Sequence, residues 1–399
     1  MLSTVFLLRI LTDINNVVCN NYKVVKNMLI QFWVKNFKNF KDKLTFNFYD
    51  TNHYEFSKDC IKNDIVKTAL IYGVNGCGKS NLAFAIFDII SHLTDMEITP
   101  DKYMNYINAN TDRNSIAEFG YIFKFENTIL RYSYGKTELR TLIFEKLEIN
   151  NKVLVEYDRR NRNERYFKTN LAGSETLNTD LSQFTISVLK YIKTSTVLKD
   201  NEEKKVLFKF FNFVDSMLHF RSLDDRFYQG YETGRVDIFD YIADKHLDDF
   251  NSFLHQVKLD IPTVTAEKTN ERKRLFMQFD NKKIGFSSNA STGTMTLALF
   301  YFWLKRMEEH KPSLVFIDEF DAFYHQELSE FIVRQLQKLD CQVILTTHNT
   351  RLLSNDLMRP DCCFILKNGI LAPLSSLTDK ELREAHNIEK MYRAKVFDK

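Results

Sequence analysis

The sequence predicts an α/β protein with a mostly parallel central sheet, an antiparallel β subdomain and a helical insert. The run IVKTALIYG (65–73) is a short apolar strand, and a glycine-rich turn and a helical pattern (79–93) follow it. Two later apolar runs, at 313–317 and 341–347, end in polar residues, and 117–168 contains several short strands. Continuous apolar strands are typical of parallel sheets buried on both faces, whereas short strands separated by polar turns indicate an antiparallel meander.

The composition indicates a globular chain without a strong overall charge. The 399 residues are 44% hydrophobic and carry a net charge of +3, so no general basic field indicates nucleic acid or an acidic membrane surface. Six cysteines form no Cys-x-x-Cys pair, which favours a reducing, cytoplasmic location. No stretch approaches the ~18 apolar residues of a membrane span. Residues 1–27 are interpreted as a peripheral N-terminal extension, because Met28 directly precedes a clean strand pattern.

The hydrophobic pattern divides the rest of the chain into two lobes and an insert. Residues 28–172 begin with an alternating pattern that predicts a β-hairpin, and they include the glycine-rich turn and the meander. Residues 173–257 have helical spacing, including the segment 204–220, and are predicted to form a compact helical insert. Residues 258–399 contain the later strands and form the second lobe.

The glycine-rich turn matches the phosphate-binding pattern G-x-x-x-x-G-K-S. Glycines let consecutive N–H groups point at a phosphate, and the following helix adds the positive end of its dipole. Lys79 would bridge the β- and γ-phosphates of ATP, and Ser80 would give its hydroxyl to Mg²⁺. An accidental glycine turn is the alternative, but the strand–turn–helix order favours the phosphate loop. The predicted nucleotide contacts here are Gly73, Asn75, Gly76, Cys77, Gly78, Lys79, Ser80 and Asn81.

Two carboxylates follow the apolar strand at 313–317. Asp318 fits an acid that holds Mg²⁺, and Glu319 fits a general base that polarises the attacking water. A solvated strand end is the alternative. Adjacent acids at the exit of a buried strand are costly unless a cation or a proton-transfer role keeps them there.

The strand at 341–347 leads directly to His348, and a Ser/Thr/Gly turn stands before the apolar helix at 294–304. His348 could sense the γ-phosphate, although a lone histidine is usually satisfied by neighbouring groups. In the turn, Ser291 could cap the helix, and Gly293 would permit close backbone approach. Capping alone would explain Ser291.

The order of these motifs resembles the ABC-related ATPase heads of the RecF/SMC/OLD type. Several stretches, such as GVNGCGKSNL, ASTGTMTLALF and FIDEFDAFYHQELSEFIV, are similar to AAA-type ATPases of bacterial abortive-infection and anti-phage loci. The resemblance implies signature roles for Ser291 and Gly293, a switch role for His348, and a role for Asp321 in communication between two heads. It also implies that ATP and Mg²⁺ lie between two chains. The turn departs from the Leu-Ser-Gly-Gly-Gln of transporters, and no glutamine is assigned to the Mg²⁺ shell.

This resemblance leads to one main functional hypothesis and two alternatives. The main one is an ATP-gated homodimer or higher oligomer that senses a trigger and controls a partner effector, a nuclease or toxin, in anti-phage defence. The first alternative is a RecF/SMC-like DNA-repair ATPase that clamps DNA directly, so a nucleic-acid contact stays open. The second alternative, a self-contained nuclease, is disfavoured because the residues after His348 contain few acids and no Asp-x-Asp pair.

Overall fold

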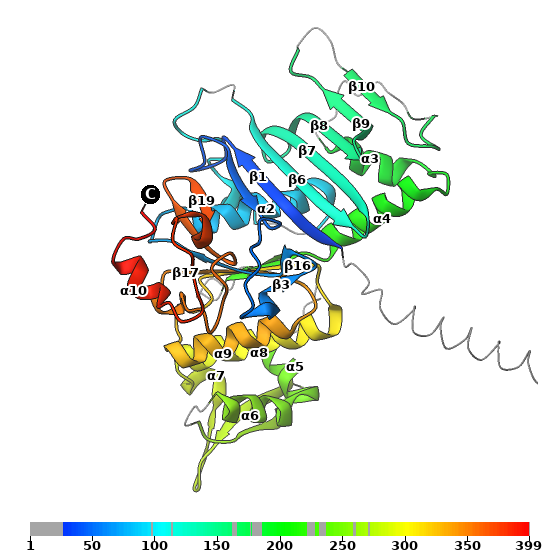
Figure 1. The fold of residues 1–399 in the computed structure, drawn as a ribbon. Coiled ribbons are helices and arrows are strands. Elements are labelled where there is room, and N and C mark those ends of the chain that lie inside the picture. The colour runs from blue at the N-terminus through cyan, green and yellow to red at the C-terminus, as the bar shows by residue number, and fades with distance from the viewer. Residues whose placement is uncertain are drawn as a thin grey trace, which may run out of the picture.

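The structure is a computed structural model of an α/β protein with two seven-stranded sheets on either side of one buried helix (Figure 1). It describes residues 27–96, 99–112, 115–161, 166–175, 177, 186–221, 228–230, 237–257, 261–269 and 272–398. The predicted N-terminal extension therefore lies, except for Asn27, outside the described residues.

The first sheet is antiparallel and has the strand order β10-β9-β8-β7-β6-β1-β2. Its strands are β1 (Met28–Lys35), β2 (Leu44–Asn47), β6 (Ala117–Phe125), β7 (Thr128–Glu138), β8 (Thr141–Ile149), β9 (Lys152–Asp158) and β10 (Tyr166–Thr169). β1 and β2 form the predicted hairpin, in which Phe32 is opposite Phe46. Consecutive pairing of β6 to β10 confirms the predicted meander.

The second sheet has the order β12-β11-β16-β17-β5-β18-β19 and carries the predicted phosphate loop. Its strands are β5 (Thr68–Tyr72), β11 (Leu218–Arg221), β12 (Tyr228–Gly230), β16 (Leu314–Asp318), β17 (Gln342–Thr347), β18 (Cys363–Lys367) and β19 (Ile370–Pro373). The five inner strands are parallel, and β12 and β19 are antiparallel edges. Every residue of β5, β16 and β17 is buried, as the apolar runs at their centres predict.

Helices cover both faces of this central sheet (Figure 1). The helices of the described chain are α2 (Lys79–Leu93), α3 (Val188–Ser195), α4 (Glu202–Asp215), α5 (Ile238–Lys245), α6 (Leu247–Gln256), α7 (Phe286–Asn289), α8 (Thr292–His310), α9 (Gln326–Lys338) and α10 (Ile388–Arg393). Helix α2 lies between the two sheets, whereas α8 and α9 cover the opposite face of the central sheet. Two small antiparallel sheets complete the fold: β3 (Ile61–Lys62) with β4 (Ile65–Val66), and β13 (Val264–Thr269) with β14 (Arg272–Gln278) and β15 (Lys283–Gly285).

The helical prediction for 204–220 is wrong at its C-terminal end. Helix α4 stops at Asp215, and Leu218–Arg221 forms β11, which pairs in parallel with β16. The segment Met217–Phe220 after α4 is too short for its hydrophobic periodicity to distinguish a helix from a buried strand, and the pairing with β16 makes it a strand. Part of the segment 173–257 therefore belongs to the central sheet and is not helical.

A buried polar cluster fastens α2 to the antiparallel sheet. Asp88 of α2 is fully buried and lies 2.8 Å from Lys136 Nζ of β7. Its two carboxylate oxygens also accept hydrogen bonds from the hydroxyls of Tyr106, at 2.8 Å, and Tyr134, at 2.9 Å. Burial lowers the pKa of Lys136, and the nearby Asp88 opposes that shift. The position of α2 therefore depends on a paired charge that water does not reach.

We expect Lys136→Met to lower the free energy of unfolding by about 3–5 kcal/mol, because it leaves the Asp88 carboxylate buried without its cation. Urea unfolding followed by circular dichroism measures the change. The double variant Asp88→Asn/Lys136→Met should recover part of the loss. Lys35→Met is the matched control, since Lys35 is exposed and lies 4.0 Å from Glu118, and it should cost less than about 1 kcal/mol. Equal effects of the two lysine substitutions would contradict this account.

Candidate functional site

The turn between β5 and α2 has the geometry of a cradle for an anion. Gly76 and Gly78 have φ values of 79° and 108°, which a residue with a side chain rarely adopts. Lys79 is 5% exposed, and its Nζ donates to the carbonyl oxygens of Gly73, at 2.6 Å, and Val74, at 3.3 Å. A buried ammonium with carbonyl partners at the start of a helix is a donor set suited to phosphate.

The β1–β2 hairpin supports this turn through Asn39, which the sequence analysis did not identify. Asn39 Nδ2 donates to the carbonyl oxygen of Cys77 at 3.3 Å, and Asn81 Nδ2 donates to Asn39 Oδ1 at 2.7 Å. A methyl group built on Gly78 would lie 2.3 Å from Asn39 Nδ2. The Lys/Asn-rich break between the two hairpin strands was visible in the sequence, but nothing in it indicated a contact with residues 40 positions away.

Asp318 joins the phosphate loop to the end of β16. Ser80 Oγ donates to Asp318 Oδ2 at 2.6 Å, and Thr346 Oγ1 donates to Asp318 Oδ1 at 2.7 Å. The Asp318 side chain is fully buried. The structure thus places the predicted Mg²⁺ ligands Ser80 and Asp318 in direct contact. A hydroxyl and a carboxylate are oxygen donors, which fit a hard divalent cation such as Mg²⁺.

Glu319 occupies a strained backbone position next to this contact. Its φ is 50°, in the left-handed region that non-glycine residues seldom adopt, and its N–H donates to Thr346 Oγ1 at 2.7 Å. Backbone strain of this kind costs about 1–3 kcal/mol and tends to occur at functional sites. The side chain is partly exposed, so it could reach a water molecule at the mouth of the site.

Arg221 faces the same carboxylate from the neighbouring strand. In the parallel pairing of β11 and β16, Arg221 is opposite Asp318, and its Nε lies 3.1 Å from Asp318 Oδ2. No glutamine was placed in the predicted metal shell, and the structure puts this arginine against the acid. The sequence analysis missed Arg221 because it assigned residues up to 220 to a helix.

Asp321 and His348 lie beyond the two acids. Asp321 Oδ2 accepts a hydrogen bond from Thr347 Oγ1 at 2.8 Å, and burial raises the pKa of Asp321. The charge of His348 opposes that shift in the pKa of Asp321, so the two predicted residues are near each other. His348 follows β17 directly and is exposed, which leaves its imidazole accessible to a ligand.

The Ser291–Gly293 turn stands apart from the phosphate loop. Ser291 is exposed and caps α8, because its Oγ accepts a hydrogen bond from the N–H of Thr294 at 3.2 Å. The predicted cap is therefore confirmed. A methyl group on Gly293 would lie 3.3 Å from the carbonyl oxygen of Phe323. Among the described residues, no hydrogen bond joins Ser291 or Gly293 to residues 73–80.

Together these contacts assemble a site at the carboxyl ends of β5, β16 and β17. Ligands of open parallel sheets bind at this edge. The loop can hold phosphates through backbone N–H groups and Lys79, and Ser80 with Asp318 can hold a divalent cation. Glu319 directly follows Asp318 in the chain, and its carboxylate can serve as a base. Within one chain, the Ser291–Gly293 turn is not part of this group of residues.

Comparisons with known proteins identify a family. Residues 69–354 match the family model described as "AAA domain, putative AbiEii toxin, Type IV TA system", which covers more than half of the chain. No curated protein matches the chain. Similar solved structures include the SMC head domain from Thermotoga maritima, with 16% identity, coverage of 86% of this chain and 97% of that chain, and a TM-score of 0.43.

Two further structures are similar at the same low level of identity. One is an SMC head bound to the C-winged helix domain of ScpA, with 14% identity, coverage of 87% and 97%, and a TM-score of 0.43. The other is the recombination mediator RecF with ATP, with 14% identity, coverage of 87% and 99%, and a TM-score of 0.38. Among the described residues, no helix has the length and apolarity that crossing a membrane requires.

We expect Gly78→Ala to lower the affinity for a fluorescent ATP analogue at least tenfold. The new methyl group would collide with Asn39 and force φ away from 108°, so the loop could no longer hold its shape. Asn39→Ala in the same chain should restore part of the affinity by removing the collision. Gly369→Ala is the matched control, because Gly369 has a φ of 76° with open space around it and is not part of the loop. Normal binding by Gly78→Ala would refute the cradle geometry.

Proposed function

The chain belongs to the AAA-domain family of the AbiEii-toxin type, and from this premise we propose that it is an ATP-hydrolysing, nucleotide-gated dimer or higher oligomer. In this proposal it acts in the cytoplasm, senses a trigger and controls a partner effector, a nuclease or toxin, in anti-phage defence. The observation that carries the ATPase part is the 2.6 Å contact of Ser80 Oγ with Asp318 Oδ2 beside the buried Lys79. It brings a phosphate-binding group and a metal-binding group together at one sheet edge.

Each residue then has a role that follows from its position. Lys79 exchanges its two carbonyl acceptors for the β- and γ-phosphates. The exchange is favourable because an ammonium forms stronger hydrogen bonds with anionic oxygens than with neutral ones. Ser80 and Asp318 hold Mg²⁺, which would neutralise charge on the phosphates when bound. Glu319 accepts a proton from the attacking water. His348, exposed beyond the acids, donates to the terminal phosphate.

Arg221 balances the charge of Asp318 while no cation is bound. A carboxylate without exposure to water requires a positive partner, and the guanidinium at 3.1 Å supplies one. Asp318 and Ser80 would hold Mg²⁺, whose charge would replace that of the guanidinium, and Arg221 would then be able to pair with the phosphates. Arg221 thus competes with the metal for the same oxygen.

The dimer is proposed because Ser291 lacks a role in ATP binding within one chain. Ser291 is exposed at the N-terminus of the 19-residue helix α8, where the helix dipole favours an anion. A second chain could present its bound γ-phosphate to this end. Asp321, with Thr347 as its partner, would then lie near the seam between the chains.

A RecF/SMC-like repair ATPase that clamps DNA directly remains the alternative function. The net charge of +3 disfavours it, because DNA binding depends on a dense basic surface and is strongly salt-dependent. A defence role predicts that a neighbouring gene encodes a nuclease or toxin. A repair role predicts salt-sensitive binding of duplex DNA by the ATP-bound dimer.

We expect Glu319→Gln to bind ATP with normal affinity and to lower hydrolysis at least 100-fold, because water activation is lost while the phosphate and metal groups remain. The variant should accumulate as a dimer with ATP, measured by light scattering. Adding Ser291→Arg should leave ATP binding intact and abolish the dimer. Rapid ATP hydrolysis by Glu319→Gln would mean that another residue is the base. A dimer that persists in the double variant would mean that Ser291 only caps α8.

We expect Arg221→Gln to lower the Mg²⁺ concentration needed for half-maximal binding of a fluorescent ATP analogue about threefold to tenfold. The substitution removes the guanidinium that lies 3.1 Å from Asp318 Oδ2 and competes with the metal for this oxygen. Titration of Mg²⁺ at fixed nucleotide measures the effect. Arg306→Gln, which removes an arginine paired with Glu309 instead, is the control and should show no change. A higher Mg²⁺ requirement in Arg221→Gln would mean that the arginine assists the metal.

A further inference from the structure

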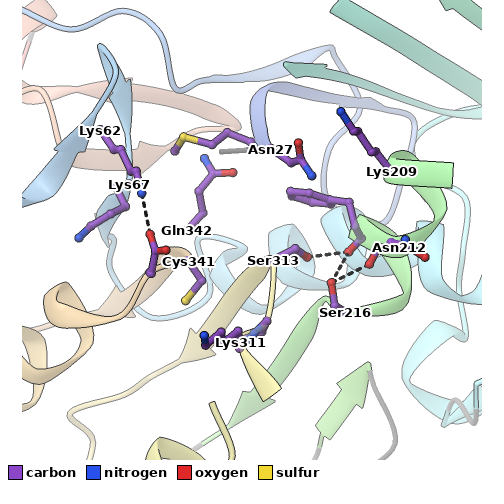
Figure 2. Close-up of a pocket in the computed structure, with 14 residues that line it drawn as sticks. Asn27, Lys62, Lys67, Lys209, Asn212, Ser216, Lys311, Ser313, Cys341 and Gln342 are labelled. Atoms are coloured by element: carbon purple, nitrogen blue, oxygen red, sulfur yellow. Dashed lines mark hydrogen bonds and ion pairs between the residues drawn. The ribbon is translucent and has the colours of Figure 1, made fainter. Parts of the chain in front are cut away.

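A second hollow lies at the edge of the central sheet opposite the phosphate loop (Figure 2). Its lining includes Gln342 at the start of β17, Ser313 just before β16, and Lys67 just before β5. The cavity has a volume of about 180 Å³. It is therefore built on the amino ends of the same strands whose carboxyl ends hold the candidate nucleotide site.

The rim of this cavity is strongly basic. Four lysines from separate segments of the chain line it, namely Lys62, Lys67, Lys209 and Lys311, against the single carboxylate of Asp340. Figure 2 shows these lysines around the hollow from different sides. The lining residues thus carry a net charge of +3.

Neighbouring negative groups offset much of this charge. Helices α4, α8 and α9 all end at this edge, and their dipoles contribute roughly half a negative charge each. Asp340 pairs with Lys62 at 2.6 Å, and Glu126 outside the cavity pairs with Lys209 at 2.8 Å. Asp59 also acts on Lys67 and opposes the lowering of its pKa, so the rim offers an acidic ligand individual lysine side chains and not a large net charge.

Two of the lysines, Lys67 and Lys311, form no ion pair within 4.0 Å of another described residue, although the Asp59 carboxylate acts on Lys67 from farther away. Lys67 is partly buried and donates to the carbonyl oxygen of Gln337 at 2.6 Å, and burial lowers the pKa of Lys67. Lys311 is exposed, has a φ of 46° as the C-cap of α8, and forms no ion pair with another described residue. A carboxylate entering the hollow would meet both ammonium groups at little cost in existing contacts.

The interior of the cavity differs from its rim. Phe213, Met28, Pro312 and Cys341 give it apolar walls. The hydroxyls of Ser216 and Ser313 both donate to the carbonyl oxygen of Phe213, so they already have hydrogen-bond acceptors. The hollow thus combines an apolar interior with cations at its mouth.

We propose that this cavity docks a short acidic segment of a partner protein, which inserts one large apolar side chain and pairs its flanking carboxylates with the rim lysines. The volume supports this occupant, because a cavity of about 150 Å³ accommodates a benzene-sized group. A nucleic-acid backbone would use the lysines but leave the apolar walls without a partner. The combination of charge and apolar surface therefore favours a peptide over DNA or RNA.

This inference rests on the proposed function only for the existence of a partner. The cavity needs no nucleotide, and none of its residues belongs to the phosphate loop or to the acids after β16. Docking and ATP binding can therefore be measured separately. Failure of one would leave the other intact.

The test uses the full chain and a fluorescein-labelled peptide, EDEFEDE, with binding followed by fluorescence anisotropy at 50 mM NaCl. We expect Lys209→Glu/Lys311→Glu to weaken binding at least tenfold, and 300 mM NaCl to weaken binding to the parent chain severalfold. The peptide EDEGEDE should bind at least fivefold more weakly, and KRKFKRK should not bind. Lys380→Glu, a charge reversal at an exposed lysine that does not line the cavity, should bind like the parent.

Each variant is also tested for binding of a fluorescent ATP analogue. Normal binding shows that the variant is folded and that its nucleotide site is intact, so a loss of peptide binding can be attributed to the cavity. Equal binding of EDEFEDE and EDEGEDE would contradict the insertion of an apolar side chain into the cavity. Unchanged binding by the double lysine variant would overturn the role of the rim. A 20-nucleotide single-stranded DNA is also tested as a competitor. If this DNA displaces the peptide from the parent chain and does not bind Lys209→Glu/Lys311→Glu, the surface binds nucleic acid and the proposal is overturned.

Discussion

The hydrogen bond from Ser80 to Asp318 is the contact on which the rest of the site depends. It joins the first turn of α2 to the last residue of β16 across 238 positions of sequence. The two residues meet because β16, β17 and β5 are adjacent and parallel, so their carboxyl ends reach the same edge. Thr346 at the end of β17 fixes the other oxygen of the acid. A shift of one residue in any of these pairings would separate the loop from its acid.

The position of α2 is the second constraint, and it links the site to the antiparallel sheet. Tyr121 donates from β6 to the carbonyl oxygen of Ala85, and Gln229 donates from β12 to that of Phe87. The buried pair of Asp88 and Lys136 adds a charge that cannot move without losing its partner. Groups from both sheets therefore hold the helix that starts at the phosphate loop. Motion of the loop relative to either sheet is costly, which suits a rigid nucleotide cradle.

Much of this architecture could be predicted because it follows from local sequence. The glycine loop, the buried strands ending at Asp318 and His348, and the cap at Ser291 each depend on residues close together in the chain. The family match agrees with the recognition of an AAA-type ATPase of the abortive-infection kind. The roles of the site residues and the division at 173 and 257 stay predictions, although β11 lies inside the predicted insert.

The remaining features depend on contacts between distant segments. Asn39 reaches the loop only because the β1–β2 hairpin folds over it, and Arg221 reaches Asp318 only through the β11–β16 pairing. A short segment such as Met217–Phe220, with three apolar residues and one histidine, fits either a helix or a buried strand, so its sequence could not reveal that pairing. The residues that sequence reasoning missed are thus those that reach the candidate site only through contacts between segments far apart in the chain.

Sheet order also determines how the two edges of the central sheet can communicate. β5, β16 and β17 have five or six residues each, so each strand spans about 16–20 Å between the nucleotide edge and the lysine-rimmed edge. These strands are fully buried and hydrogen-bonded to each other, and a close-packed core does not deform gradually. A signal from ATP to a partner docked at the far edge would therefore pass through movement of whole elements. Helices α8 and α9 are suited to this, because α8 begins directly after Ser291, α9 begins five residues after Asp321, and both end within two residues of a residue that lines the lysine-rimmed cavity.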